Sequence, residues 1–117
     1  MSEEEIRQFV KKFYEALDAG DAETASALFP DGTKIYLWDG TVFNTQAEFK
    51  AWFVELYSTS ENAKREVVKF EVDGNKAKVE VVLHASIDGE EKTVKLKHEF
   101  YFEGDKVKEV KVEIEPL

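Results

Sequence analysis

Hydrophobic residues near the start of the chain recur every three or four positions, which is the spacing of one face of an α-helix. They are Ile6, Phe9, Val10, Phe13 and Leu17. Ser2 and Glu5 form a capping-box pattern ahead of this stripe, and Gly20 behind it is a residue that commonly ends helices. The pattern therefore predicts a helix over residues 3–19.

Two more helices are predicted before residue 60. A short one follows Asp21, which is a good N-cap, and stops at residues 30–32; a third begins with a Thr45–Glu48 capping box and fades over residues 58–60. Their apolar stripes consist of Ala25, Leu28 and Phe29, and of Phe49, Trp52, Phe53, Leu56 and Tyr57.

In two parts of the chain the hydrophobic period changes to two, the period of a β-strand. Residues 34–38 and 41–43 are predicted to pair as a hairpin around Asp39-Gly40. From Ala63 onward, turns at residues 73–75, 88–90 and 103–105 separate four long strands. This arrangement predicts an antiparallel meander.

The alternation slips between Val67 and Val68 and again between Val107 and Val110, and such slips indicate β-bulges that bend a sheet. We therefore expect one α+β domain over residues 1–117. Its three helices, all in the N-terminal half, pack on a strongly curved antiparallel sheet, and the resulting cone encloses an apolar pocket.

Composition narrows the possible functions. Hydrophobic residues make up 43% of the 117 residues and aromatic residues 13%, which indicates either a dense core or a cavity lined with rings. The net charge of −9 disfavours nucleic acid and anionic membranes as partners. The absence of cysteine excludes disulfides, thiolate zinc sites and cysteine nucleophiles, and two histidines are too few for a histidine-rich metal site.

The local patterns agree with one another unusually well. Every glycine lies in a predicted turn or at a helix end, and Lys, Glu and Val fill the exposed strand positions, which is typical of engineered sequences. No apolar run is long enough to span a bilayer, and the acidic N-terminus lacks the basic start of a signal peptide. We expect a monomer without a targeting signal that stays in the cytoplasm when expressed.

His98 is the one titratable residue on an apolar strand face. The strand over residues 90–103 places Val94, Leu96, His98, Phe100 and Phe102 on the same side. Two interpretations remain open here: a core histidine satisfied by one hydrogen bond, or a member of a functional site.

Tyr14 and Asp18 lie four residues apart on the first helix, one above the other beside Val10. The simpler interpretation is a boundary tyrosine and a solvated aspartate. However, a carboxylate in the last turn of a helix opposes the helix dipole, which indicates that another group holds it.

Arg65 is, besides Arg7, the only arginine in a chain that otherwise uses lysine for its cations. It shares its strand phase with Val67, so its guanidinium can point inward, where it would need a carboxylate such as Asp18. The alternative is an ordinary cation at a strand edge.

Several other polar and aromatic positions carry weaker signals. His84 is expected on the outer face of its strand, without a role, and Asp39 at the rim of the pocket. Trp38 is a second rim candidate, and Trp52, Phe53 and Tyr57 of the third helix are candidates for the pocket wall, with core packing as the default. No Gly-rich phosphate loop, metal-spaced ligand cluster or serine elbow occurs.

The order of three helices and a curved sheet resembles the nuclear-transport-factor-like superfamily, which includes ketosteroid isomerases and polyketide cyclases. Nearly the full length is similar, in register and without gaps, to the LuxSit-type de novo designed luciferases built on that scaffold. The matching stretches are Ile6-Arg7-Gln8-Phe9, Phe13-Tyr14-Glu15-Ala16-Leu17-Asp18, Leu37-Trp38-Asp39-Gly40, Arg65-Glu66, Leu83-His84-Ala85 and His98.

This resemblance implies a synthetic coelenterazine-type luciferin such as diphenylterazine, oxidised by O2 without a metal or organic cofactor. In that scheme Arg65 stabilises the anionic imidazopyrazinone core and Asp18 orients Arg65. Tyr14 and His98 form a second hydrogen-bonded pair, with His98 as a proton acceptor. The residues expected to bind the luciferin and exclude water are Phe13, Trp38, Trp52, Phe53, Tyr57, Leu96, Phe100 and Val110.

The chain departs from the designed pattern at one point, where Ser60 replaces a second arginine. Anion stabilisation would then fall mainly on Arg65.

Two other functions remain open at this stage. One is proton transfer of the ketosteroid isomerase kind, with Tyr14 and Asp39 as the acting groups, although His98 stands where a carboxyl would be needed. The other is a designed small-molecule-binding scaffold without catalysis, because an aromatic cone can hold a flat ligand without reacting with it.

Overall fold

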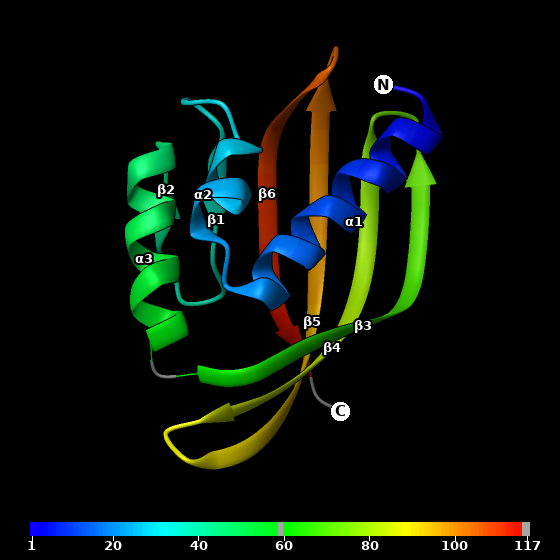
Figure 1. The fold of residues 1–117 in the computed structure, drawn as a ribbon. Helices are drawn as coiled ribbons and strands as arrows, with labels where there is room; N and C mark the ends of the chain where they lie inside the picture. Colours follow the sequence, from blue (N-terminus) through cyan, green and yellow to red (C-terminus); the bar gives the residue numbers. More distant parts are fainter. Residues whose placement is uncertain (59, 116–117) are drawn as a thin grey trace.

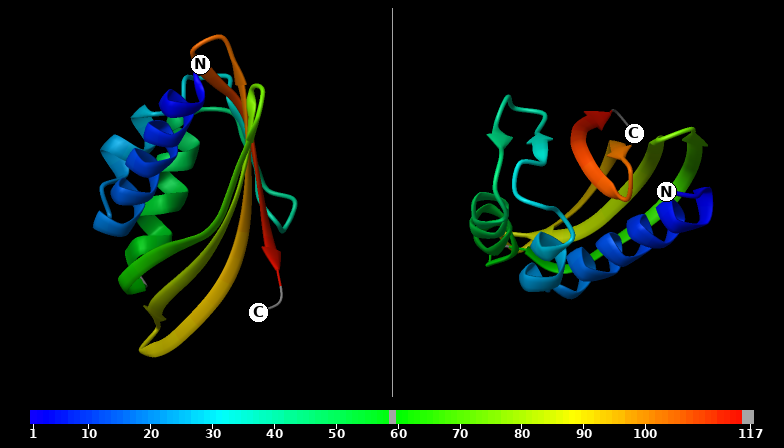
Figure 2. Two further views of the ribbon diagram at one scale, coloured as in Figure 1. Left: turned by 90° about the vertical axis from the view of Figure 1, so that its right-hand side faces the viewer. Right: turned by 90° about the horizontal axis from the view of Figure 1, so that it is seen from above.

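The structure is a computed structural model that describes residues 1–58 and 60–115. Three helices lie on one face of a six-stranded sheet (Figures 1 and 2). The elements in chain order are α1 (Glu3–Ala19), α2 (Ala22–Ala27), β1 (Lys34–Tyr36), β2 (Val42–Phe43), α3 (Gln46–Ser58), β3 (Ser60–Asp73), β4 (Lys76–Ile87), β5 (Glu90–Glu103) and β6 (Lys106–Glu115). None of these helices is long and apolar enough to cross a membrane.

The helix ends follow the local sequence. Both hydrogen bonds of the Ser2–Glu5 capping box are present, and Gly20 ends α1 in the left-handed region at φ 70°. The Asp21 side chain accepts a hydrogen bond from the Thr24 N–H and so caps α2. These signals are short-range, and the predicted bounds of α1 are therefore confirmed.

The sheet has the strand order β2-β1-β6-β5-β4-β3. Strands β3 to β6 form the predicted antiparallel meander, but β1 runs parallel to β6, with Ile35 opposite Val110. The sheet is therefore mixed, and the expectation of a wholly antiparallel sheet is wrong on this point. Alternation within β1 indicates a strand but carries no information about which edge that strand joins.

The predicted bulges are confirmed. In β3, Val67 and Lys69 both pair with β4, but residue 68 between them has no partner. In β6, residue 108 likewise has no partner, because the residues on either side of it pair with Phe102 and Tyr101 of β5. A further irregularity, between Glu61 and Lys64, was not predicted.

Strand β3 also begins earlier than expected, at Ser60 rather than Ala63. Its first part is irregular, because Asn62 has φ 55°, a left-handed conformation that asparagine tolerates better than most residues. The alternation of hydrophobic and polar residues is lost in this part of β3, so the sequence pattern does not identify where the strand begins. Thr59, which the pattern placed at the end of the third helix, lies outside the described residues.

The sheet curves toward the helices and remains open at β2 and β3 (Figure 2). The core fills the concave side, and its largest fully buried side chains are Phe100, Ile6, Val10, Val79, Val81 and Val110. The curvature leaves α1 close against β3, whereas α3 covers the other end of the concave face (Figure 1).

Candidate functional site

An apolar cavity of about 210 Å³ lies between α3, the end of α1 and the concave face of the sheet. Its wall includes Phe13, Trp38, Trp52, Phe53, Leu96 and Val110, six of the residues expected to bind a ligand. Only two ionisable side chains, Arg65 and His98, reach this wall among the described residues. In such an environment each polar group has a large electrostatic effect because an apolar wall screens charge only weakly.

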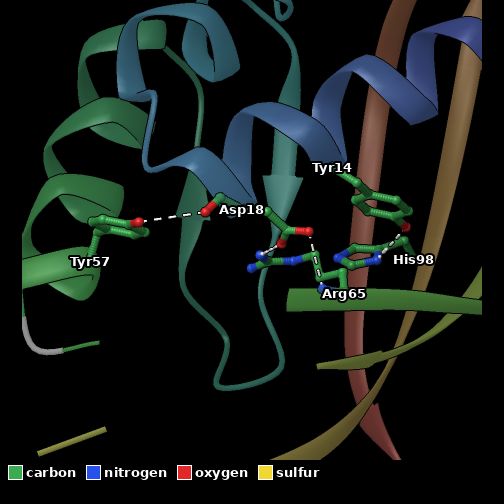
Figure 3. A network of polar contacts seen from close by, with 5 residues as sticks. All are labelled: Tyr14, Asp18, Tyr57, Arg65 and His98. Carbon is green, nitrogen blue, oxygen red and sulfur yellow. Dashed lines mark hydrogen bonds and ion pairs between the residues drawn. The ribbon is translucent and has the colours of Figure 1, made fainter. Parts of the chain in front are cut away.

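Arg65 is held by Asp18 (Figure 3). The guanidinium Nη1 donates a hydrogen bond to Asp18 Oδ1 at 2.8 Å, and the Arg65 backbone N–H donates to Asp18 Oδ2 at 3.1 Å. The carboxylate at the end of α1 thus has the partner that its position against the helix dipole requires. Asp18 fixes both the side chain and the main chain of Arg65.

The Nε of Arg65 is buried without a hydrogen-bond partner among the described residues. The side chain as a whole is only 9% exposed. A buried donor without a partner is costly, and it is rare in folded proteins. Arg65 therefore brings a positive charge to the cavity wall, and one of its donors remains unused by the described part of the protein.

Local irregularity in β3 explains why a charged residue lies there. Arg65 sits between the two places where the pairing with β4 shifts, and its neighbours Lys64 and Glu66 point to solvent. Arginine keeps its charge even when buried, so the pairing with Asp18 is needed in the folded state.

The second pair joins α1 to β5. The hydroxyl oxygen of Tyr14 lies 2.9 Å from Nδ1 of His98, and both side chains are buried. The Nε2 of His98 makes no hydrogen bond with any described residue, although His98 lines the cavity. The ring therefore has one nitrogen tied to Tyr14 and the other free for a ligand.

Burial sets the charge state of this pair. Burial, followed by the nearby positive charge of Arg65, lowers the pKa of His98 to about 3. Burial also raises the pKa of Tyr14 well above its usual value, and Arg65 opposes this only in part. At neutral pH the imidazole and the phenol are thus both uncharged, and Arg65 is the cation beside them. This arrangement favours an anion in the cavity.

Two residues expected in the wall lie elsewhere. The Tyr57 ring packs on Gly20, and its hydroxyl donates a 3.5 Å hydrogen bond to the Asp18 carbonyl oxygen. Phe100 is fully buried in contact with Phe13 and lies behind the wall. Both belong to apolar stripes, and a stripe does not distinguish a wall residue from the core layer beneath it.

Other positions of interest take no part in the cavity. Ser60 donates a hydrogen bond to the Leu56 carbonyl oxygen at 3.0 Å. Asp39 is exposed, accepts a hydrogen bond from the Thr41 N–H and does not line the cavity. His84 is exposed on the outer face as predicted, 3.2 Å from the Thr93 hydroxyl.

Sequence reasoning missed several wall residues. Leu17, Ile35, Leu37, Phe49, Leu83, Ile87, Val94, Val112 and Ile114 also line the cavity. The hydrophobic period marked many of these residues as inward-facing. Only the folded structure shows that their side chains face an empty space rather than other side chains. The described residues contain no group of three or more His, Cys, Asp or Glu that could hold a metal ion.

Comparison with known proteins identifies the fold family. The model of the SnoaL-like domain family matches residues 10–110. The chain belongs to the SnoaL-like domain family. No curated protein matches its sequence.

Solved structures with this fold include proteins with very different descriptions. A de novo designed protein with a curved β-sheet is 25% identical, with a TM-score of 0.79 over 99% of this chain and 89% of that one. An LEH-like epoxide hydrolase of M. tuberculosis is 13% identical, with a TM-score of 0.80 over 95% and 83%. An NTF2-like protein of unknown function from Burkholderia pseudomallei K96243 is 18% identical, with a TM-score of 0.85 over 98% and 92%. The SnoaL-like fold is thus shared by enzymes and by a designed protein.

Proposed function

We propose that this SnoaL-like chain is a designed luciferase that oxidises a synthetic imidazopyrazinone luciferin, such as diphenylterazine, with O2. The observation that carries the proposal is the buried Arg65, held by Asp18, with an unpartnered Nε in an apolar cavity. Such a group stabilises a flat aromatic anion, the form of the luciferin that reacts with O2. The designed protein with a curved sheet among the structural relatives supports the idea of a designed scaffold.

The reaction begins with loss of a proton from the imidazopyrazinone core. His98 Nε2 is the acceptor, because it is neutral and reaches the cavity. The resulting anion receives a charge-assisted hydrogen bond from Arg65. Tyr14 holds the imidazole through Nδ1, so that Nε2 is directed to the ligand.

The anion then gives electrons to O2 and forms a carbon–oxygen bond. The peroxide attacks the adjacent carbonyl carbon and displaces the ring nitrogen bonded to it, which gives a dioxetanone. The O–O and C–C bonds of the dioxetanone then break to release CO2 and an excited amide anion. Neither a metal nor an organic cofactor takes part. The apolar wall, with Phe13, Phe53 and Leu96, excludes water that would quench the emission.

Other functions are less well supported. Proton transfer of the ketosteroid isomerase kind needs a carboxylate beside the substrate, and no Asp or Glu lines the cavity among the described residues. A binding scaffold without catalysis uses the same cavity, and only measurement of the reaction separates it from a luciferase.

The direct test is to mix the purified protein with diphenylterazine in air and count photons. We expect emission well above that of the free luciferin, unchanged after dialysis against a metal chelator. If the luciferin binds by fluorescence titration but emits no more than in buffer, the chain is a binding scaffold and the luciferase proposal is wrong.

The role of Arg65 is tested by Arg65→Ala, with Arg7→Ala as the matched control at the half-exposed arginine of α1. We expect Arg65→Ala to lower the light by about 100-fold, as loss of one anion-stabilising donor does. Its melting temperature should change little, because Asp18 is 29% exposed and keeps the backbone N–H of residue 65 as a partner. Extensive unfolding of Arg65→Ala would instead indicate a purely structural ion pair.

A further inference from the structure

A second hollow lies on the other side of the Arg65–Asp18 pair. It is a groove of about 300 Å³ between α1 and β3, and its wall includes Tyr14, Asp18, Arg65 and Val67. Arg7, Lys11 and Glu15 of α1 also line it, together with the apolar Val10 and Phe70, so it carries more polar surface than the cavity does. A groove of this size has room for several water molecules.

The Tyr14–His98 hydrogen bond connects the two hollows. Tyr14 lines the groove but not the cavity, and His98 lines the cavity but not the groove. Their side chains meet at 2.9 Å, beside Arg65 (Figure 3). A hydrogen bond between two buried side chains therefore joins a residue of the cavity wall to a residue of the groove wall.

We infer that Tyr14 and His98 form a proton path that carries protons between a ligand in the cavity and the groove between α1 and β3. The path supplies a route for the proton that the proposed reaction releases, but it does not depend on that reaction. Any ligand that presents an acidic proton to His98 Nε2 would use this path.

The transfer is balanced in protons and charge. The ligand gives its proton to His98 Nε2, and His98 Nδ1 releases its own proton to the Tyr14 oxygen. Tyr14 passes its original hydroxyl proton to a water in the groove. The ligand becomes an anion beside Arg65, the water becomes hydronium, and histidine and tyrosine both remain neutral. The reverse sequence returns a proton to the product and restores the first tautomer of His98.

The surrounding charges favour such a relay over storage of the proton on His98. An imidazolium would lie in an apolar cavity beside the Arg65 guanidinium, and both conditions disfavour it. The charged groups of the groove are Arg7, Lys11, Glu15 and Asp18 on α1 and Arg65 on β3. Burial and the Arg65 charge thus both disfavour storage of the proton on the ring.

The probe for this path is 2-naphthol, a flat phenol that becomes a strong acid in its excited state. Bound 2-naphthol is excited at a wavelength longer than those that tryptophan absorbs. The yield of naphtholate emission then reports proton transfer out of the cavity. The bound population is selected by its slow decay of anisotropy, and the dissociation constant of 2-naphthol is measured for each variant.

Two neighbouring valines of β3 provide a matched pair of variants. Val67 lines the groove and is 46% exposed, whereas Val68 is 51% exposed and does not line it. Val67→Phe should obstruct the groove and lower the naphtholate yield roughly tenfold, as should Tyr14→Phe, whereas Val68→Phe should match the unmodified protein. Dissociation constants should stay the same.

The path also predicts the isotope dependence of the transfer. In mixtures of H2O and D2O, a plot of the transfer rate against the deuterium fraction should be curved for the unmodified protein, because several protons move together. The same plot should be linear for Tyr14→Phe. Equal naphtholate yields in Val67→Phe and Val68→Phe would overturn the inference. A higher naphtholate yield in Trp38→Ala would also overturn it, because the proton would then leave through the mouth of the cavity at the half-exposed Trp38.

Discussion

His98 shows how the surroundings of a single residue determine its chemistry. The same chain holds a second histidine, His84, on the outer face of β4, where it is exposed and bonded to Thr93. His98 lies on the inner face of β5, buried between Tyr14 and Phe100, and remains neutral at physiological pH. The functional difference between the two residues therefore comes from which strand face each occupies.

The lowered pKa of His98 makes stability depend on pH. The unfolded histidine binds a proton below pH 6.5, whereas the folded one does so only near its pKa of about 3, so acid favours unfolding between these values. Relative to His98→Gln, the unmodified protein should lose about 2 kcal/mol of unfolding free energy between about pH 7 and about pH 5. Urea denaturation at the two pH values measures this loss.

The control for this prediction is His84→Gln, which removes the exposed histidine. It should show the same pH dependence as the unmodified protein. A loss that persists in His98→Gln would assign the acid sensitivity to carboxylates instead.

At the scale of elements, the end of α1 links the helices to the site. Gly20 ends the helix, Tyr57 of α3 packs on it, and Asp18, two residues earlier, holds Arg65 of β3. α1, α3 and β3 thus meet at one helix terminus (Figure 3). The position of Arg65 in the cavity depends on this junction rather than on β3 alone.

Gly20→Ala tests this junction. A positive φ at alanine costs about 1 kcal/mol, and the added methyl group would also clash with the Tyr57 ring. Gly74→Ala provides the matched control, because Gly74 has a similar φ of 61° and no atom near the added Cβ. We expect Gly20→Ala to lower the melting temperature clearly more than Gly74→Ala. Equal losses would mean that Tyr57 moves aside without cost.

At the scale of the whole molecule, the charge distribution opposes the chemistry of the cavity. The protein carries a net charge of −9, whereas the cavity contains one cation, Arg65, among its described wall residues. An anionic ligand is therefore repelled at long range and attracted only once it is inside. Entry of the ligand in its neutral form, followed by loss of a proton in the cavity, avoids this barrier.

This charge distribution predicts the effect of salt on binding. The association rate of the anion 2-naphthoate should rise roughly threefold when salt is raised from about 20 to about 200 mM, because salt screens the long-range repulsion. The rate for neutral 2-naphthol should stay constant. Stopped-flow fluorescence measures both rates, and a decrease for 2-naphthoate would show that Arg65 already attracts anions from solution.

The sequence by itself determined what depends on near neighbours. The Ser2–Glu5 box, the glycine at residue 20 and the turns of the meander set the element bounds, and alternation placed His98 on the inner face of β5. Arg65 is unusual because, apart from Arg7, the chain uses lysine for its cations, and Asp18 because its charge opposes the dipole of its own helix. These signals act within one helix turn or one strand pair, so they are visible before folding.

Only the tertiary structure decided how these elements meet. It placed β1 parallel to β6, moved Tyr57 onto Gly20, and put Phe100 behind the cavity wall rather than in it. It also showed that Arg65 and Tyr14 border a second hollow. The physical reason is that periodicity specifies which side of an element faces inward, whereas an empty space exists only where side chains from several elements fail to fill it.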